Sequence, residues 1–291
     1  LSRRGRARGC RVILTGNGGD EWLTVSPFLT ADLIREGRLG EALRFIRVLA
    51  RSHRVSPLDA YGRGIWTFGL RPLAVRALAR AFPAAFQARR MRNMAAAIPA
   101  WVAPDPALRR AVQDRADRVL AAPTPGATYY EREMRTALDH PLNAIEAEEY
   151  FEMGRRLGMQ IRHPYWDADL VEVLYRVPPH VLSKGGRSKG LVRETLARRF
   201  PTLGFERQRK VHATYFYRRT MRAQGPAAWA SLGGARTLAS LGVVDARMHA
   251  AAMDRLFAGQ RATESYRIWT TLQLEAWARR RVRSNRENAH D

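Results

Sequence analysis

The sequence predicts a mainly α-helical fold with a remnant parallel β element. The 291 residues are 46% apolar and 26% charged, which is enough apolar material to form a buried core. A single β-branched apolar burst stands near the N-terminus, whereas later apolar residues recur at helical spacing. We expect a strand, a glycine-rich turn and helices over 1–60, followed by a basic helical segment over 61–125. A core that carries the sequence motifs is expected over 126–220, and C-terminal helices over 221–291.

The N-terminal segment predicts a strand, a turn and two helices. Arg-Val-Ile-Leu at 11–14 is typical of a buried strand of the parallel type, and Gly-Asn-Gly-Gly-Asp-Glu follows at 16–21. Helices are expected over 28–34 and over 39–49. Because a central strand seldom opens a domain without a partner before it, we expect sequence to be missing upstream of Leu1.

The segment 61–100 carries seven arginines and no acidic residue, with Leu70, Leu73, Ala77 and Phe82 at helical spacing between them. One interpretation is a basic amphipathic helix that meets a membrane, an acidic peptide or nucleic acid. The other, which we favour, is a solvated arginine face over an ordinary core.

Further helices follow from local signals. Thr128 and Glu131 have the spacing of a capping box, and Gly158 is placed to end a helix over 144–157. Asp169 and Glu172 suggest the N-cap of a short helix that ends before Pro178. A last helix is expected over 272–283.

Composition excludes several classes of protein. Cys10 is the only cysteine, so a disulfide framework or a cysteine zinc site is excluded, and the seven histidines are scattered without metal-ligand spacing. No apolar run is long enough to span a membrane and the arginine-rich start lacks the apolar core of a signal peptide. We therefore expect a soluble, cytoplasmic protein without a membrane partner.

The formal charge of +23 comes from 47 arginines and only three lysines. Phosphate-backbone binding alone would not exclude lysine, so we attribute the charge to nucleotide composition of the gene and expect no nucleic-acid partner. The lysines are confined to one stretch, at Lys184, Lys189 and Lys210. In such a chain Lys210 suggests a compact positive charge that meets a developing oxyanion or a departing phosphate, although a solvated surface lysine is the alternative.

The glycine-rich turn combines two features that phosphate chemistry needs. Glycines let backbone N–H groups approach an anion, and Asp20 and Glu21 offer the oxygen ligands that magnesium prefers. An ordinary βα turn with a capping Asp is the structural alternative. The Gly-Gly-Asp-Glu hairpin of diguanylate cyclases is a weaker one, because here Trp22 follows and leads toward a helix. Farther on, Arg162 opens Arg-His-Pro-Tyr-Trp-Asp and could clamp an anion.

Three motifs in order carry a family resemblance: Leu-Thr-Gly-Asn-Gly-Gly-Asp-Glu, then Arg-His-Pro-Tyr-Trp-Asp, then Gly-Gly-Arg-Ser-Lys with a later lysine. Over about residues 8–220 the chain resembles the synthetase domain of the asparagine synthetase family, which includes β-lactam synthetases and lasso-peptide cyclases. The resemblance implies the C-terminal part of an asparagine-synthetase-type α/β domain, similar to adenine nucleotide α-hydrolases.

The resemblance also implies roles for residues. Thr15, Gly16 and Asn17 would lie beside the adenylated substrate, with Gly18, Gly19 and Arg162 also counted as nucleotide-binding. Asp20 would coordinate Mg²⁺, Glu21 would support that site as a catalytic residue, and Lys210 would stabilise the transition states. The reaction would use ATP to activate a small-molecule or peptide carboxylate as an acyl-adenylate, which an amine then converts to an amide.

Three departures from the family pattern qualify this expectation. The pyrophosphate loop Ser-Gly-Gly-x-Asp-Ser and the glutamine-hydrolysing domain are absent from these 291 residues. Gln160 stands where many members carry glutamate, and with Asn17 this argues against β-lactam synthetase activity, which needs a Tyr/Glu pair at those positions. We expect a fragment of an amide ligase that works with a missing N-terminal region or a glutaminase partner. The alternative is a degenerate, non-catalytic homologue that acts as a basic binding protein.

Overall fold

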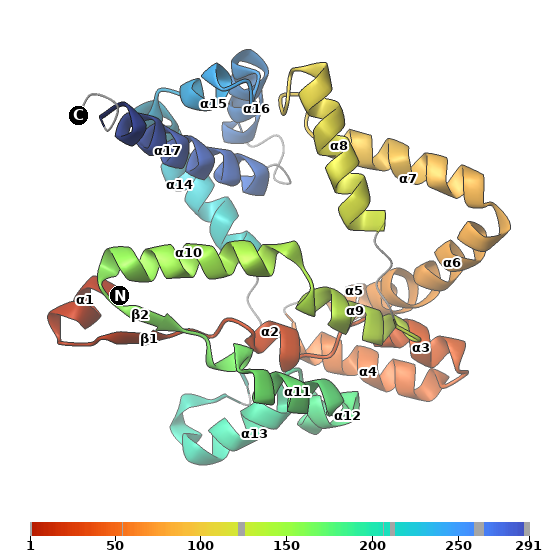
Figure 1. Ribbon diagram of the computed structural model, residues 1–291. Coiled ribbons are helices and arrows are strands. Elements are labelled where there is room, and N and C mark those ends of the chain that lie inside the picture. The colour runs from red at the N-terminus through yellow and green to blue at the C-terminus, as the bar shows by residue number, and fades with distance from the viewer. Residues whose placement is uncertain are drawn as a thin grey trace. The chain divides into compact units, whose positions relative to one another are not determined.

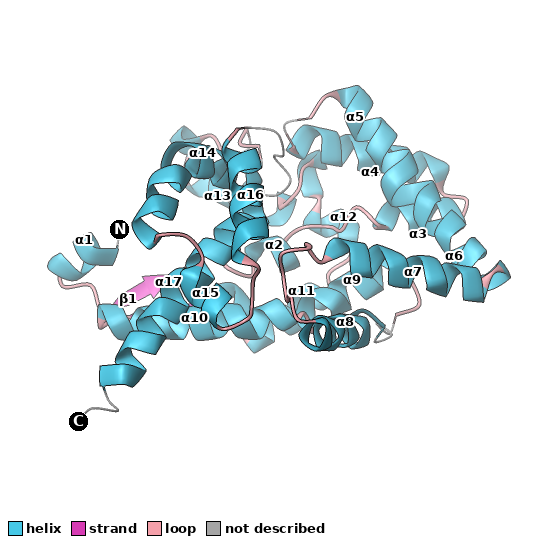
Figure 2. Ribbon diagram, turned by 90° about the horizontal axis from the view of Figure 1, so that it is seen from above, coloured by secondary structure: helices cyan, strands magenta, loops and turns pink. Residues whose placement is uncertain are grey.

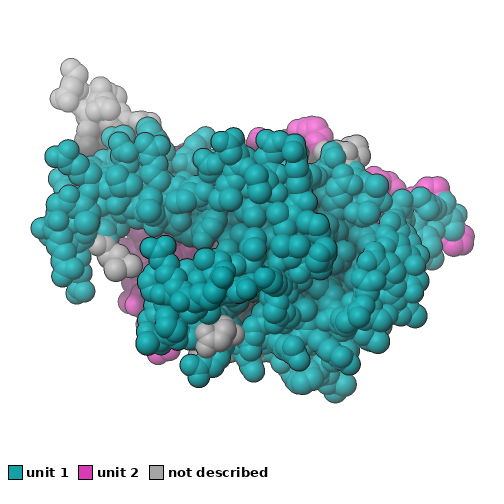
Figure 3. All heavy atoms as spheres, turned by 90° about the horizontal axis from the view of Figure 1, so that it is seen from below, with its two compact units in different colours: residues 1–81, 124–210 teal, residues 82–123, 211–291 magenta. Residues whose placement is uncertain are grey.

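The computed structural model describes residues 2–53, 55–121, 126–205, 207–209, 213–258 and 265–287. Over these residues the chain is mostly helical, with one parallel pair of short strands (Figures 1 and 2). It divides into two compact units, coloured separately in Figure 3, and each is built from two stretches of sequence. Unit 1 comprises 1–81 and 124–210, and unit 2 comprises 82–123 and 211–291.

Unit 1 contains both strands and most of the short helices. Its first stretch holds α1 (Ser2–Ala7), β1 (Val12–Leu14), α2 (Gly19–Trp22), α3 (Leu29–Arg35), α4 (Leu39–Ser52), α5 (Pro57–Gly62), the π-helix η1 (Arg63–Leu70) and α6 (Arg71–Ala81). Its second holds α9 (Tyr129–Leu138), α10 (Pro141–Leu157), β2 (Gln160–Arg162), η2 (Pro164–Trp166), α11 (Ala168–Arg176), α12 (Pro179–Leu182), η3 (Lys184–Gly186), α13 (Gly190–Arg199) and η4 (Pro201–Leu203).

The two strands confirm the predicted parallel element but not its burial. β1 pairs with β2 in parallel, with Ile13 opposite Ile161. Val12 is 46% exposed and Leu14 is 69% exposed. The prediction of a buried strand was wrong for the described structure, because in this two-stranded sheet nothing covers those side chains.

The core of unit 1 forms directly after the glycine-rich turn. Trp22 is fully buried and packs edge-on against Trp166, with ring centroids 5.4 Å apart. Around it lie Leu23, Val25, Leu33, Phe45, Met134, Leu174 and Leu182. The turn is therefore anchored on one side to the main apolar cluster of its unit.

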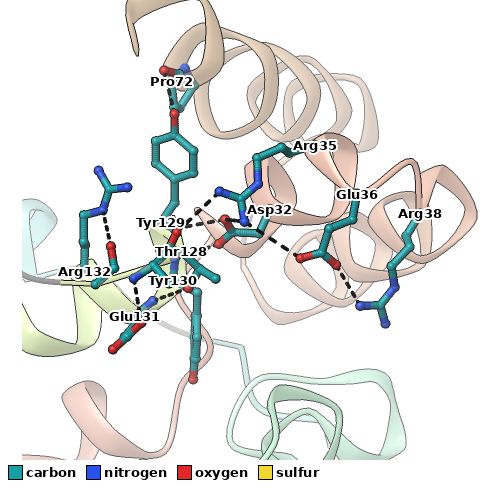
Figure 4. A network of polar contacts seen from close by, with 12 residues as sticks. Asp32, Arg35, Glu36, Arg38, Pro72, Thr128, Tyr129, Tyr130, Glu131 and Arg132 are labelled. Atoms are coloured by element: carbon teal, nitrogen blue, oxygen red, sulfur yellow. Dashed lines mark hydrogen bonds and ion pairs between the residues drawn. The ribbon is translucent and has the colours of Figure 1, made fainter.

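A buried carboxylate joins the two stretches of unit 1. Asp32 on α3 accepts hydrogen bonds from the backbone N–H groups of Tyr129 (3.0 Å) and Tyr130 (2.8 Å) at the start of α9 (Figure 4). Thr128 caps the same helix as predicted, since its side chain accepts from the N–H of Glu131 at 3.0 Å. These bonds fix α9 against α3.

The described residues of unit 2 form helices joined by turns and loops, with one isolated antiparallel bridge between Val102 and Val244. It holds α7 (Pro83–Ala97), α8 (Pro106–Ala121), α14 (Ala213–Leu232), α15 (Arg236–Ser240), α16 (Ala246–Phe257) and α17 (Ser265–Glu287). Met221, Met253, Leu256, Ile268 and Leu272 form one buried cluster, and Ala235, Leu238, Val244 and Ala278 another.

Two local expectations need correction. α11 is capped by Asp167, whose carboxylate accepts from the N–H of Leu170 at 3.1 Å, and not by Asp169 or Glu172, because Asp167 holds the extended conformation that precedes the helix. The apolar residues of α6 do not cover an ordinary core, since no described residue of α6 or α7 is buried. None of the described helices is long and apolar enough to cross a membrane.

Candidate functional site

The glycine-rich turn lies at the carboxyl end of β1, beside the residues that follow β2. The N–H of Thr15 donates to the carbonyl of Arg162 at 3.0 Å and so continues the parallel pairing past the strand. The Thr15 hydroxyl and Nδ1 of His163 are hydrogen-bonded at 2.6 Å. The ring of His163 packs against Tyr150 of α10, with centroids 4.5 Å apart. The first and second motifs therefore meet directly.

Hydrogen bonds within the turn use its first backbone donors. The N–H of Asn17 donates to Thr15 Oγ1 (3.3 Å), that of Gly18 to Asn17 Oδ1 (3.0 Å), and that of Gly19 to the carbonyl of Gly16 (3.1 Å). The Asn17 amide also reaches Glu146 of α10 at 3.4 Å. In this conformation these three N–H groups are engaged within the turn and are not free to bind an anion.

Gly18 and Gly19 are needed for close packing. Gly18 has φ +91°, and a Cβ there would lie 2.9 Å from Cβ and 3.0 Å from the carbonyl carbon of Tyr165. A Cβ on Gly19 would lie 3.3 Å from the Tyr165 ring. By contrast, Gly16 has open space around it. The glycines thus bring Tyr165, in the second motif, against the turn.

The third motif reaches the turn through Lys189. Its Nζ lies 2.8 Å from Oδ1 of Asp20, and the two side chains are 33% and 52% exposed. Lys189 is the N-cap of α13 and adopts the left-handed conformation, with φ +59°, which is uncommon for a residue with a side chain. A constrained backbone therefore delivers the ammonium group to the carboxylate.

The loop that carries Lys189 is held at several points. A side chain on Gly190 would overlap the carbonyl oxygen of Lys184, and the N–H of Ser188 donates to the buried Ser52 hydroxyl of α4 at 2.7 Å. Arg193 donates to the carbonyls of Ser188 (2.8 Å) and Phe205 (2.6 Å). Burial, followed by repulsion from Arg187, lowers the pKa of Arg193.

The remaining predicted residues are less closely engaged. Arg162 is exposed, and its guanidinium donates to Gln160 Oε1 at 3.0 Å. Because that partner is neutral, the charge of Arg162 is not compensated by a carboxylate among the described residues. Glu21 follows Asp20 in α2 and is half-buried. Lys210 lies outside the described residues.

Comparison with known proteins gives the family. The asparagine synthase family model matches residues 1–279. The chain belongs to the asparagine synthase family. Searches of curated proteins and of solved structures found no match. At the level of the family, membership points to ATP-dependent amide ligation, which members perform with ATP and typically with Mg²⁺.

The carboxylates of this asparagine synthase family chain fit a magnesium ion that arrives with phosphate groups. Among the described residues no group of three or more His, Cys, Asp or Glu side chains forms a cage for a metal ion. Magnesium is commonly held by one or two carboxylates together with substrate phosphates and water. Asp20 is half-exposed and Glu21 is adjacent, so these two carboxylates suit a magnesium ion that is also bound to a nucleotide. In the structure, Lys189 neutralises the charge of Asp20.

Sequence reasoning missed three residues of this site. Lys189 is one of the three lysines of the chain, and the use of lysine in place of arginine could have identified it as well as Lys210. His163 and Tyr165 lie inside a motif that was singled out, but only the pairing of β1 with β2 shows that they face Thr15 and Gly18. Their role was not readable from spacing along the chain.

Proposed function

We propose that this protein forms an amide bond by activating a carboxylate with ATP. A carboxylate oxygen of the substrate attacks the α-phosphorus of ATP, and pyrophosphate leaves. The nitrogen of an amine then attacks the acyl carbon, AMP leaves with the electrons of the broken C–O bond, and the amine nitrogen loses a proton. The acyl substrate is a small molecule or a peptide.

One observation carries this proposal: three motifs from distant parts of the sequence meet at one edge of the two-stranded sheet. Thr15 bonds to His163 at 2.6 Å, Gly18 packs on Tyr165, and Asp20 pairs with Lys189 at 2.8 Å. A βα turn serving only to connect a strand and a helix would not need partners that lie about 150 and 170 residues away.

The charges at this edge support phosphate chemistry. Asp20, with Glu21, would hold a magnesium ion bound to phosphate oxygens, and the ion would offset negative charge as pyrophosphate departs. Lys189 supplies positive charge at Asp20 and Arg162 supplies it at the end of β2, and Arg162 has no carboxylate partner in the described structure. Lys210 would provide further charge for the transition states.

The amine is one that needs no dedicated base. Asn17 and Gln160 carry amides at the two positions where a base would stand, and both are engaged, Asn17 with Glu146 and Gln160 with Arg162. An amide side chain cannot accept a proton at neutral pH. Ammonia or a primary amine, already nucleophilic when uncharged, fits this arrangement better than an amide nitrogen.

The test uses the full-length protein with ATP, Mg²⁺, an amine source and candidate carboxylates, among them aspartate. Mass spectrometry would follow the amide product, and AMP release would be measured in parallel. We expect Lys210→Ala and Asp20→Asn to lower the turnover at least about 100-fold. Lys184→Ala is the matched control, since the ammonium of Lys184 pairs with Glu194 at 2.8 Å and not with a residue of the turn.

Two results would contradict the proposal. One is amide formation that survives both Lys210→Ala and Asp20→Asn. The other is the absence of AMP release and pyrophosphate exchange with every carboxylate, with or without a glutaminase partner, which would favour the non-catalytic alternative.

A further inference from the structure

A band of exposed apolar and basic side chains runs along η1 and α6 in unit 1. We call it the η1–α6 face and define it as Arg63, Trp66, Leu70, Arg71, Val75 and Leu78. Trp66 is 59% exposed and Leu78 is 54% exposed. Within η1 and within α6 the members are three or four residues apart, and Leu70 and Arg71 are adjacent where the π-helix continues as α6, so the face follows one continuous helical segment.

The opposite side of the segment explains why this band faces outward. Gly64 and Gly69 are buried, and a Cβ there would lie 2.6 Å from Ile46 and 2.7 Å from Ile34, so η1 approaches α4 and α3 through its smallest residues. α6 is held by the hydrogen bond from the Tyr129 hydroxyl to the carbonyl of Pro72, at 3.1 Å. The segment is thus attached through its glycine side and through Phe68, which packs edge-on against Phe28, while the side chains of the η1–α6 face remain outside.

The charge of the face is uniformly positive. No acidic residue occurs between Asp59 and Asp105. Among the described residues no carboxylate pairs with Arg63 or Arg71. An exposed apolar band of this kind, flanked by uncompensated guanidinium groups, is typical of a helix that lies at the interface of an anionic membrane.

We propose that the η1–α6 face docks on an anionic lipid surface. A second copy of the chain is disfavoured as the occupant, because a symmetric contact would bring the arginines of this face against the same uniformly positive face of the copy. The face is also one helix side rather than a groove between elements, and a fluid interface can bury such a convex strip. The earlier expectation of no membrane partner rested on the lack of a spanning segment, which this peripheral mode does not need.

The test measures binding of the full chain to vesicles of phosphatidylcholine alone and of equal parts phosphatidylcholine and phosphatidylglycerol. We expect binding to the anionic vesicles only. The pair Arg63→Gln and Arg71→Gln should lower the partition coefficient about 20-fold. The charge-matched pair Arg155→Gln and Arg176→Gln, on α10 and α11, should change it by less than about twofold.

The apolar contribution is tested separately. Trp66→Ser with Leu78→Ser should lower partitioning at least about tenfold, whereas Phe151→Ser with Val173→Ser, at positions 72% and 60% exposed, should not. With brominated lipids, Trp66→Phe should remove most of the tryptophan quenching. Trp277→Phe, also at an exposed position, should leave the quenching in place.

Three outcomes would overturn the proposal. The first is no preference for anionic vesicles. The second is an equal loss of binding in the face variants and in their matched controls, which would reduce the effect to the net charge of the chain. The third is binding of soluble poly-glutamate through Arg63 and Arg71 without vesicle binding, which would give the face to an acidic peptide.

Discussion

Both units contain a buried carboxylate that caps a helix, but the surroundings of the two carboxylates differ. In unit 1, Asp32 accepts from Tyr129 and Tyr130, and Arg35 lies 3.5 Å away. In unit 2, Glu275 accepts from the N–H groups of Thr237 (3.0 Å) and Leu238 (2.9 Å), and is completely buried. No cation pairs with Glu275 in the described part of the chain.

The neighbour of Glu275 is instead a buried histidine. His249 is completely buried between Trp101 and Trp229, at centroid distances of 4.7 and 5.1 Å, and neither ring nitrogen has a hydrogen-bond partner among the described residues. Burial lowers its pKa to about 4, and the charge of Glu275 only partly opposes this effect. Although the chain has 47 arginines, the described partners of Glu275 are backbone donors. Unit 2 should therefore be sensitive to removal of Glu275 and, through His249, to acid.

Removal of Glu275 or Asp32 should cause the largest change in stability and so tests the comparison of the two units most directly. Glu275→Ala should lower the stability of unit 2 by about 4 kcal/mol, because it leaves two buried N–H groups without acceptors and opens a cavity. Asp32→Ala should cost about 3 kcal/mol in unit 1, since the smaller residue leaves a smaller cavity. Amide hydrogen exchange read at 237–238 and at 129–130 would separate the units.

The control for both variants is Glu172→Ala, at an exposed position paired with Arg176, which should change stability by less than about 0.5 kcal/mol. Equal loss of protection in both units, whichever carboxylate is removed, would show that the two units unfold as one and would contradict the comparison.

Acid should affect unit 2 through His249. The folded pKa is about 4 against an ordinary value of 6.5, so the unfolded chain binds a proton first as the pH falls. Stability is therefore full above about pH 6.5 and is lost progressively toward pH 4, by about 3 kcal/mol in total. Urea unfolding between pH 7 and pH 4 would measure this loss.

His249→Leu should remove most of that pH dependence, while His180→Leu, at an exposed position on α12, should retain it. If the wild-type protein and His249→Leu lost the same stability over this range, His249 would not be the responsible group.

Sequence reasoning succeeded where the signal was local. The cap at Thr128, the left-handed stop at Gly158 and the helices α3 and α4 depend on neighbours within a few residues, so the sequence contains the whole cause. The same holds for the family resemblance, because each of its motifs is a short continuous stretch of sequence. The family match over residues 1–279 confirms that resemblance.

It failed where burial depended on partners remote in sequence. Val12 and Leu14 have the pattern of a buried strand, but burial requires layers that no short pattern encodes. Leu70 and Phe82 belong to a repeat typical of a core face, yet both are exposed, and at η1 it is the buried glycines that pack. The pairing of Lys189 with Asp20 likewise depends on the left-handed conformation of Lys189 at the start of α13. A lysine in the sequence does not predict that conformation.

Substitution of one glycine in each unit should change stability by an intermediate amount. Gly18→Ala should destabilise unit 1 by about 3 kcal/mol, because φ +91° is strained for alanine and the new Cβ meets both Cβ and backbone of Tyr165. In unit 2, Gly225→Ala meets only the ends of the Phe257 and Met221 side chains and gains helix propensity, so we expect about 1 kcal/mol or less. Thermal unfolding of both variants would check the order of the two losses in stability. A greater loss for Gly225→Ala would mean that the turn accommodates a Cβ more easily than the packing around α14 does.

The smallest expected effect concerns the two described non-glycine residues with positive φ, one in each unit: Ala103 (φ +49°) and Lys189 (φ +59°). Replacing either by glycine relieves about 1–2 kcal/mol of strain, against a greater entropy loss on folding of about 0.5–1 kcal/mol. Because Ala103 is also buried, Ala103→Gly loses a methyl contact worth about 0.8 kcal/mol, so the stability of its unit should stay near that of the wild type. Lys189→Gly also loses the ion pair with Asp20, worth up to about 1 kcal/mol at a partly exposed position, so its stability should stay near that of the wild type. Since the fold survives this substitution, a large loss of amide formation in Lys189→Gly would reflect the missing ammonium group, and unchanged activity would show that Lys189 serves only the backbone of the loop.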